Sequence, residues 1–174
     1  MNSVNAMNPH KILSRNDDET LVRRVTQSIE KIDYDFSKFT IPGFAQWISA
    51  KRGIDIQIDR CDELKTPPGF WFLSEDRAYI KYSSHLPPIL EAITILHELL
   101  HVYFGHTTLH VSADSIPLIE YQWGIAARDP LQKSPEDKEA EIGAILLYQR
   151  IRDGEPGTNH SKQVPDLFDN VVDI

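Results

Sequence analysis

Residues 89–104 read Ile-Leu-Glu-Ala-Ile-Thr-Ile-Leu-His-Glu-Leu-Leu-His-Val-Tyr-Phe, and this stretch decides the fold. Apolar residues surround almost the whole circumference of a helix with this sequence, so we expect the helix to be central and buried. Its polar side chains fall on one narrow stripe, formed by Thr94, His97, Glu98 and His101. Burying polar groups without partners costs several kcal/mol. The stripe therefore predicts a bound cation with its water, or other polar partners, inside the fold.

The spacing of the two histidines favours a metal site. An α-helix turns about 100° and rises about 1.5 Å per residue, so His97 and His101 lie on one face, about 40° and about 6 Å apart. Both rings can then reach one ion, while Glu98 is rotated away and can reach a water beside it. This His-Glu-x-x-His arrangement is typical of zinc-dependent hydrolases. The alternative is a pair of core histidines hydrogen-bonded to the backbone or to carboxylates.

Length and composition limit the classes of protein. The chain has 174 residues, which suits a single domain with a sizeable core. It has no apolar run long enough to predict a membrane span, and its first residues lack the apolar segment of a signal peptide. The single cysteine, Cys61, excludes an internal disulfide and indicates a reducing cytoplasm. The net charge of −8 argues against direct nucleic-acid binding.

The hydrophobic periodicity predicts an α+β domain, mostly helical, with a small three-stranded sheet, antiparallel or mixed, beside the His-Glu helix. We expect a flexible N-terminus over 1–18, the domain over 19–152 and a C-terminal tail over 153–174. The expected helices cover 19–32, 41–53, about 83–105 and 134–152, with a short helical possibility at 116–127, and the expected strands cover 54–59, 70–73 and 78–82.

The ends of the helices have their own signals. Acids at 17–19 suit the start of the first helix. Ser83 or Ser84 is expected to cap the His-Glu helix, with Pro87 and Pro88 in its first turn, and Gly105 to end it.

A catalytic zinc needs a third protein ligand, and the helix from Pro135 offers three acids. Glu139 shares an apolar face with Gly143, and a mid-helix glycine costs about 1 kcal/mol relative to alanine unless that face must approach another helix closely. We therefore predict Glu139 as the ligand, with Glu141 in reserve. The alternative is that Glu136, Glu139 and Glu141 are all solvated acids of a first turn.

Several of these segments together resemble the ImmA/IrrE family of metallopeptidases, over about residues 41–150. The matching segments are Gly53-Ile54-Asp55-Ile56, the His-Glu motif with Gly105-His106 after it, and Glu139-Ala140. The resemblance implies a zincin-like, gluzincin-type fold and a cytoplasmic protease that cleaves helix-turn-helix repressors, thereby releasing stress-response genes. It also implies that His97, His101 and Glu139 bind Zn²⁺, with Mn²⁺ possible, and that Glu98 is the catalytic base.

The chain departs from the family pattern at three places. Leu100 stands where glycine is common, Gly143 stands where phenylalanine is frequent, and the 107–134 connection is long. Two other functions remain open: a metal-containing regulator or toxin–antitoxin component that binds its partner without cutting it, and a hydrolase acting on something other than protein.

Two further features of the substrate site are expected. The strand at 78–82 is predicted to lie at an exposed edge, where it could pair with an extended substrate. The residue that stabilises the oxyanion is open among Tyr103, His106, His110, Tyr121 and Tyr148, and His106 is also a candidate for a residue behind the metal ligands or at the helix end.

Overall fold

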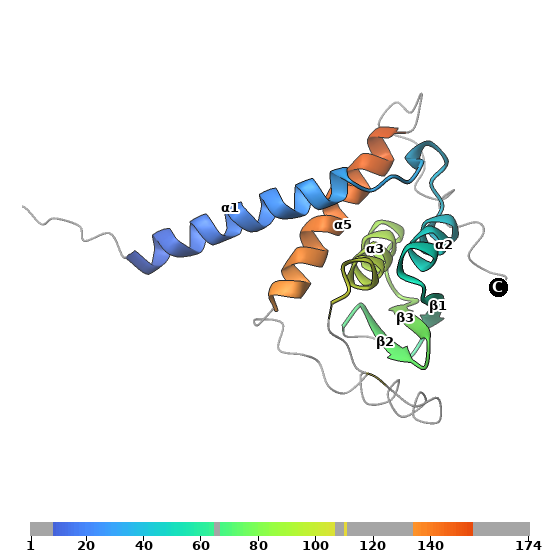
Figure 1. Cartoon of the computed structure of the whole chain (residues 1–174). Helices are drawn as coiled ribbons and strands as arrows, with labels where there is room; N and C mark the ends of the chain where they lie inside the picture. The colour runs from blue at the N-terminus through green and yellow to red at the C-terminus, as the bar shows by residue number, and fades with distance from the viewer. Residues whose placement is uncertain (1–8, 65–66, 107–109, 111–133, 155–174) are drawn as a thin grey trace, which may run out of the picture.

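The computed structural model describes residues 9–64, 67–106, 110 and 134–154; for residues 9–17 it describes the backbone alone. Within these ranges it contains four α-helices, a short 3-10 turn and one three-stranded sheet, which confirms the α+β class. In chain order the elements are α1 (Pro9–Glu30), η1 (Phe36–Lys38), α2 (Ile41–Arg52), β1 (Asp55–Cys61), β2 (Gly69–Ser74), β3 (Arg77–Ser83), α3 (Pro88–Phe104) and α5 (Pro135–Gly154) (Figure 1).

Helix α3 occupies the centre of the described fold, as its sequence predicts. It packs on β2 and β3 on one side, on α5 on another and on α2 on a third. Its apolar residues are almost completely inaccessible: Ile95, Leu99 and Leu100 are each 0% exposed. A helix that is apolar around most of its circumference gains most when covered on every side, which explains its place.

The sheet has the strand order β1-β3-β2. β1 pairs with β3 in parallel, and β2 pairs with β3 in antiparallel fashion through a tight turn in which Glu75 adopts a φ of 53°. The expectation of a mixed sheet is therefore confirmed. The expectation that residues 78–82 lie at an exposed edge is wrong, because β3 is the central strand and both its edges are hydrogen-bonded. The central position suits the sequence of β3, because its inward-facing residues Ala78, Ile80 and Tyr82 are buried, each at most 2% exposed.

The two faces of the sheet are covered differently. The inward residues of β3 and Trp71 of β2 face the main core around α3, whereas Phe70 and Phe72 pack in a separate cluster with Cys61 and Leu64. The period-2 alternation of a strand places Trp71 on the opposite face from its two neighbours. β2 therefore contributes Trp71 and the partly buried Leu73 to the main core, and Phe70 and Phe72 to the outer cluster.

The start of α3 differs from expectation. Pro87 is the N-cap and Pro88 is the first helical residue, with no side-chain cap. Ser83 is the last residue of β3, and its backbone N–H donates to the carbonyl of Pro68. The predicted serine cap is therefore wrong. Proline has no N–H to leave unpaired and its φ is already helical, so Pro88 can begin the helix. Gly105 ends α3 in the left-handed conformation, as predicted.

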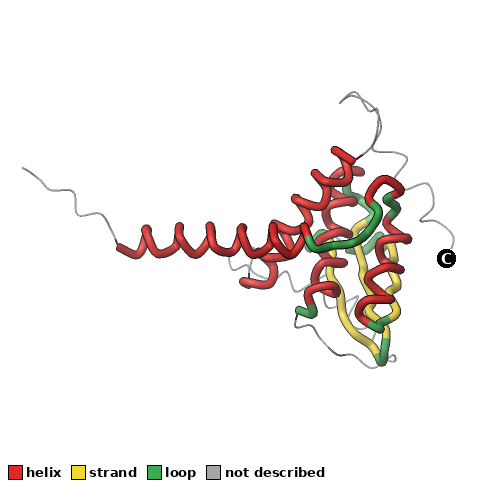
Figure 2. Tube along the Cα trace, turned by 45° about the horizontal axis from the view of Figure 1, so that its top comes forward, coloured by secondary structure: helices red, strands yellow, loops and turns green. Residues whose placement is uncertain are grey.

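Helix α1 begins earlier than expected. The sequence predicts a flexible N-terminus to residue 18, but residues 9–18 are helical and Pro9 is the first residue of α1. The predicted start at the acids 17–19 is wrong, because adding residues to an existing helix costs far less than starting one, so these acids sit inside it. The N-terminal part of α1 extends beyond the rest of the described fold (Figures 1 and 2).

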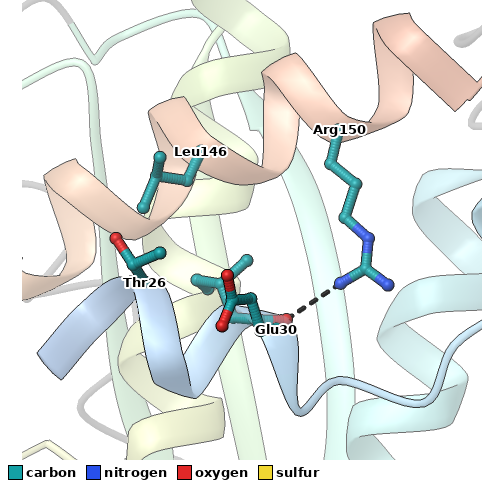
Figure 3. Close-up of a pocket in the computed structure, with 5 residues that line it drawn as sticks. Thr26, Glu30, Leu146 and Arg150 are labelled. Carbon is teal, nitrogen blue, oxygen red and sulfur yellow. Dashed lines mark hydrogen bonds between the residues drawn. The ribbon is translucent and has the colours of Figure 1, made fainter. Parts of the chain in front are cut away.

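The C-terminal part of α1 packs on α5. Arg150 of α5 donates from Nη1 to the carbonyl of Ile29 at 2.9 Å (Figure 3). Its guanidinium lies 4.3 Å from the ring centroid of Phe36. A pocket of about 250 Å³ lies on this seam, lined by Thr26, Ile29, Glu30, Leu146 and Arg150. Arg150 therefore ties the end of α1 to α5, and the pocket belongs to this helix seam.

Other expectations fall outside the described residues. These are the short helix at 116–127 and the tail from residue 155; α5 itself runs to Gly154, two residues past the expected end of the domain. Within the ranges that are described, no helix has the length and apolar character needed to cross a membrane.

Candidate metal centre

Three side chains of α3 converge on one point. His97, Glu98 and His101 each offer one ligand atom, and these atoms lie within 4.8 Å of one another. The Nε2 atoms of the two histidines are 3.0 Å apart. Glu98 and His101 are buried, at 6% and 5% exposure, and His97 is half-buried. The structure thus confirms that His97 and His101 converge, as the helical spacing predicts, and it places the Glu98 carboxylate within the same group.

The donor set fits a transition-metal ion. Two imidazole nitrogens bound to one tetrahedral zinc, each at about 2.0–2.1 Å, stand about 3.3–3.4 Å apart. The observed separation of 3.0 Å differs from that value by a small ring movement. At this distance two lone pairs repel each other unless a proton or a cation lies between them. His97 and His101 are therefore placed to share either a proton, as a hydrogen bond, or a cation, with the carboxylate of Glu98 beside them.

Strand β2 forms one wall of this site. The ring of Trp71 packs nearly parallel to that of His101, with the centroids 6.3 Å apart and the planes at 28°. At Gly69, an added Cβ would lie 2.5 Å from Cγ2 of Thr94 and 3.4 Å from Cγ of Glu98. Only glycine lets the strand pass this close to α3, so β2 leaves no room for a side chain between its backbone and Thr94.

Helix α5 brings two acids near the histidines, by different routes. Oδ1 of Asp137 lies 3.6 Å from Nε2 of His101, and its Oδ2 accepts hydrogen bonds from the backbone N–H and the hydroxyl of Ser134. Oε2 of Glu139 lies 3.1 Å from Nη2 of Arg24 and 3.6 Å from Nε2 of His106. Among the described residues, the ligand group formed by the α3 side chains does not include Glu139.

Asp137 was missed by the sequence reasoning. The available signal was the pair Ser134-x-x-Asp137, which is a helix-capping pattern. The reciprocal bonds of that cap are present, since the N–H of Asp137 also donates to Oγ of Ser134 at 3.0 Å. The pattern predicts how α5 begins, but it contains no information about which helix lies opposite.

The remaining candidates lie at different places. Nδ1 of His106 is 2.9 Å from Nδ1 of His101, and the His106 side chain is 7% exposed. Tyr103 packs on Trp47 of α2, with the ring centroids 5.6 Å apart. Tyr148 is a partly buried member of the main core, and His110 is exposed and forms an isolated bridge to Leu73 of β2. Tyr121 lies outside the described residues.

No family model, no curated protein and no solved structure matches this chain. Its function is therefore inferred from the residues and from the geometry on α3, α5 and β2.

Proposed function

We propose that this protein is a metal-dependent endopeptidase with a zincin-like domain of the ImmA/IrrE type. His97 and His101 would hold Zn²⁺ or Mn²⁺, with an acid from α5 as third ligand. The observation that carries the proposal is the convergence of the half-buried His97 and the buried His101. Their Nε2 atoms are 3.0 Å apart, and the buried carboxylate of Glu98 lies within 4.8 Å of them. A metal that only stabilises the fold would not need a base beside it.

The reaction follows from the chemistry of these groups. A divalent ion held by His97 and His101 would supply Lewis acidity, lowering the pKa of a bound water and polarising a carbonyl group. Glu98 takes a proton from the attacking water and delivers it to the nitrogen of the leaving amine, first as base and then as acid. Its burial at 6% exposure keeps the carboxylate in a poorly hydrated setting, where this transfer competes with little bulk water.

Two acids of α5 compete for the third ligand position. The resemblance favours Glu139, which reaches the region of the histidines but is paired with Arg24. Asp137 is the second candidate, because its Oδ1 lies 3.6 Å from a proposed ligand nitrogen. We propose Glu139 as the ligand and treat Asp137 as the residue to test against it.

The substrate is proposed to be a protein partner, a helix-turn-helix repressor by resemblance, encountered in the cytoplasm. Because β3 is central, an extended substrate segment would pair with an edge strand instead. β2 is the edge strand that contacts α3, and its Gly69 lies against Glu98. Leu73 on the outer edge of β2 is already bridged to His110, so the segment would pair with the part of this edge before Leu73, beside Gly69 and the proposed base.

Replacing Glu98 with Gln tests the enzyme directly. Zn²⁺ content, measured by mass spectrometry of the metal, should stay near one ion per chain, because the ligand nitrogens are unchanged. Wild-type protein should cut a member of a panel of helix-turn-helix repressors, and Glu98→Gln should cut the same repressor about 10²–10⁴-fold more slowly, measured by electrophoresis and mass spectrometry of the products.

The control is the exposed Gln149→Ala on α5, which should cut like the wild type. Equal cleavage by Glu98→Gln and wild type would refute the assigned base. A repressor that binds the wild type and stays intact would favour the alternative, a metal-containing regulator or toxin–antitoxin component that does not cut its partner.

A further inference from the structure

The C-terminal end of α3 places a third histidine directly behind the proposed metal ligand. Gly105 has a φ of 73°, its N–H donates to the carbonyl of Val102 at 3.2 Å, and the N–H of His106 donates to the carbonyl of His101 at 3.0 Å. This pair of bonds is a Schellman motif, in which the second residue after the helix folds back over the residue five positions before it. Here those two residues are His106 and His101.

The side chains follow the backbone. Nδ1 of His106 lies 2.9 Å from Nδ1 of His101, and the ring centroids are 4.9 Å apart with the planes at 75°. The other nitrogen of His106, Nε2, lies 3.6 Å from Oε2 of Glu139, which in turn lies 3.1 Å from Nη2 of Arg24. His106 therefore touches a residue of α3 with one ring nitrogen and approaches an acid of α5 with the other.

The proton positions are determined once His101 uses Nε2 as a ligand. The proton of its neutral ring must then be on Nδ1, which donates to Nδ1 of His106. His106 accepts through Nδ1, so its own proton is on Nε2, on the side of Glu139. A histidine ligand held by such an outer hydrogen bond keeps its tautomer and its ring orientation, and loses about 10–100-fold in metal affinity when the bond is removed.

We infer that His106 is a positioning residue for the proposed metal centre: it fixes His101 in the tautomer that presents Nε2 to the ion. The inference rests on the proposed metal site. It also gives the sequence His101-x-x-x-Gly105-His106 a physical meaning, because the left-handed glycine is what turns the second imidazole back onto the first.

The test measures Zn²⁺ affinity by isothermal titration of the purified chain. We expect His106→Ala to weaken binding by about 10–100-fold. His106→Asn should return to within about threefold of wild type, because the amide oxygen of asparagine takes the position of Nδ1 and accepts the same hydrogen bond. His106→Gln should not, because its amide takes the position of Nε2. His85→Ala, which removes an exposed histidine bonded to the carbonyl of Asp62, is the matched control and should leave the affinity unchanged.

The visible absorption of bound Co²⁺ gives a second readout, since it depends on coordination geometry. The spectrum of His106→Ala should differ from that of wild type, and that of His106→Asn should match it. Thermal unfolding without added metal shows which variants are folded. If His106→Ala does not fold, the Zn²⁺ affinities of His106→Asn and His106→Gln are compared with each other instead.

Different results would contradict the proposed metal site and the positioning role of His106. A wild-type chain that binds neither Zn²⁺ nor Co²⁺ would overturn the proposed function. A wild type that binds both ions, with His106→Ala equal to it in affinity and in Co²⁺ spectrum, would overturn this inference alone. Equal losses in His106→Asn and His106→Gln would also overturn it, since the acceptor at Nδ1 would then have no special role.

Discussion

At the scale of single residues, the unusual feature is the number of polar side chains with defined partners inside a region that is otherwise apolar. In the part of the chain that the structure describes, no buried side-chain nitrogen or oxygen is left without a hydrogen-bond partner. His101 illustrates this, because Nε2 faces His97 and Nδ1 faces His106. When both nitrogens of a neutral imidazole have partners, only the tautomer is left to vary, that is, which nitrogen carries the proton. The neighbours of His101 therefore decide its chemistry.

The third ligand can be identified at this scale by a matched pair of substitutions. Glu139→Gln and Asp137→Asn each remove one negative charge from the beginning of α5. We expect Glu139→Gln to weaken Zn²⁺ binding by more than about 100-fold, beyond the effect of an outer-shell residue, and Asp137→Asn to weaken it less. Titration with Zn²⁺ measures both affinities.

The reverse order of these two effects would transfer the ligand role to Asp137. Because Asp137 also accepts hydrogen bonds from Ser134 at the start of α5, thermal unfolding without metal separates a loss of the cap from a loss of a ligand. Asp153→Asn, exposed at the other end of the same helix, is the control for charge alone.

At the scale of the elements, the site depends on how closely α5 and β2 approach α3. Gly143 is buried in α5, and a Cβ added there would lie 2.7 Å from Cδ1 of Leu100 and 3.5 Å from Cδ1 of Ile29. This explains the mid-helix glycine that sequence reasoning associated with a close helix contact. It also relates two departures from the family pattern, since Leu100 and Gly143 contact each other: a larger residue on α3 faces the smallest one on α5.

This contact predicts the effect of a larger side chain. Gly143→Val should lower the free energy of unfolding by about 1–3 kcal/mol, because its methyl groups overlap the buried Leu100 side chain. Urea unfolding measures the change. In the double variant with Leu100→Ala, the space vacated by leucine should accept the valine. The loss of unfolding free energy in the double variant should therefore be smaller than the sum of the losses in the two single variants.

Strict additivity of the two substitutions would show that they do not share this contact. Helix propensity does not cause the predicted loss, because valine is a better helix former than glycine. The exposed Gln149→Val on α5 is the control for a valine in this helix that does not meet Leu100.

At the scale of the whole molecule, a second polar cluster ties the sheet to α3. Arg60 of β1 donates to Oε2 of the buried Glu91 of α3 at 2.9 Å, and Tyr82 of β3 lies beside them. Burial, and next the charge of Glu91, raise the pKa of Tyr82 to about 12, against an ordinary value of 10.0. Three elements therefore meet at one tyrosine that resists ionisation while the protein is folded.

The raised pKa predicts alkaline sensitivity. Below pH 10 the tyrosine keeps its proton in both states; between pH 10 and about 12 only the folded state keeps it, so unfolding releases a proton. The free energy of unfolding should therefore fall as the pH rises through this window. Urea unfolding at pH 8, 10 and 11 measures the slope, and Tyr82→Phe should show a smaller slope above pH 10. A wild-type slope in Tyr82→Phe would exclude this tyrosine as the cause.

The amino-acid sequence by itself determined what depends on residues close together along the chain. Helical spacing predicted that His97 and His101 converge, glycine at 105 predicted the end of α3, and alternation predicted the strands. These follow from the fixed turn and rise of a helix and from the period of a strand.

Only the tertiary structure decided what depends on partners far apart in the sequence. It made β3 the central strand, because β1 pairs with it in parallel, and it brought Asp137 and Glu139 of α5 to different nitrogens of two histidines. Local patterns describe which face of an element is apolar, but they do not contain the register or the rotation with which two elements meet. That is why residues 97–101 were enough to predict that the two histidines converge, whereas they could not predict which acid of α5 lies opposite.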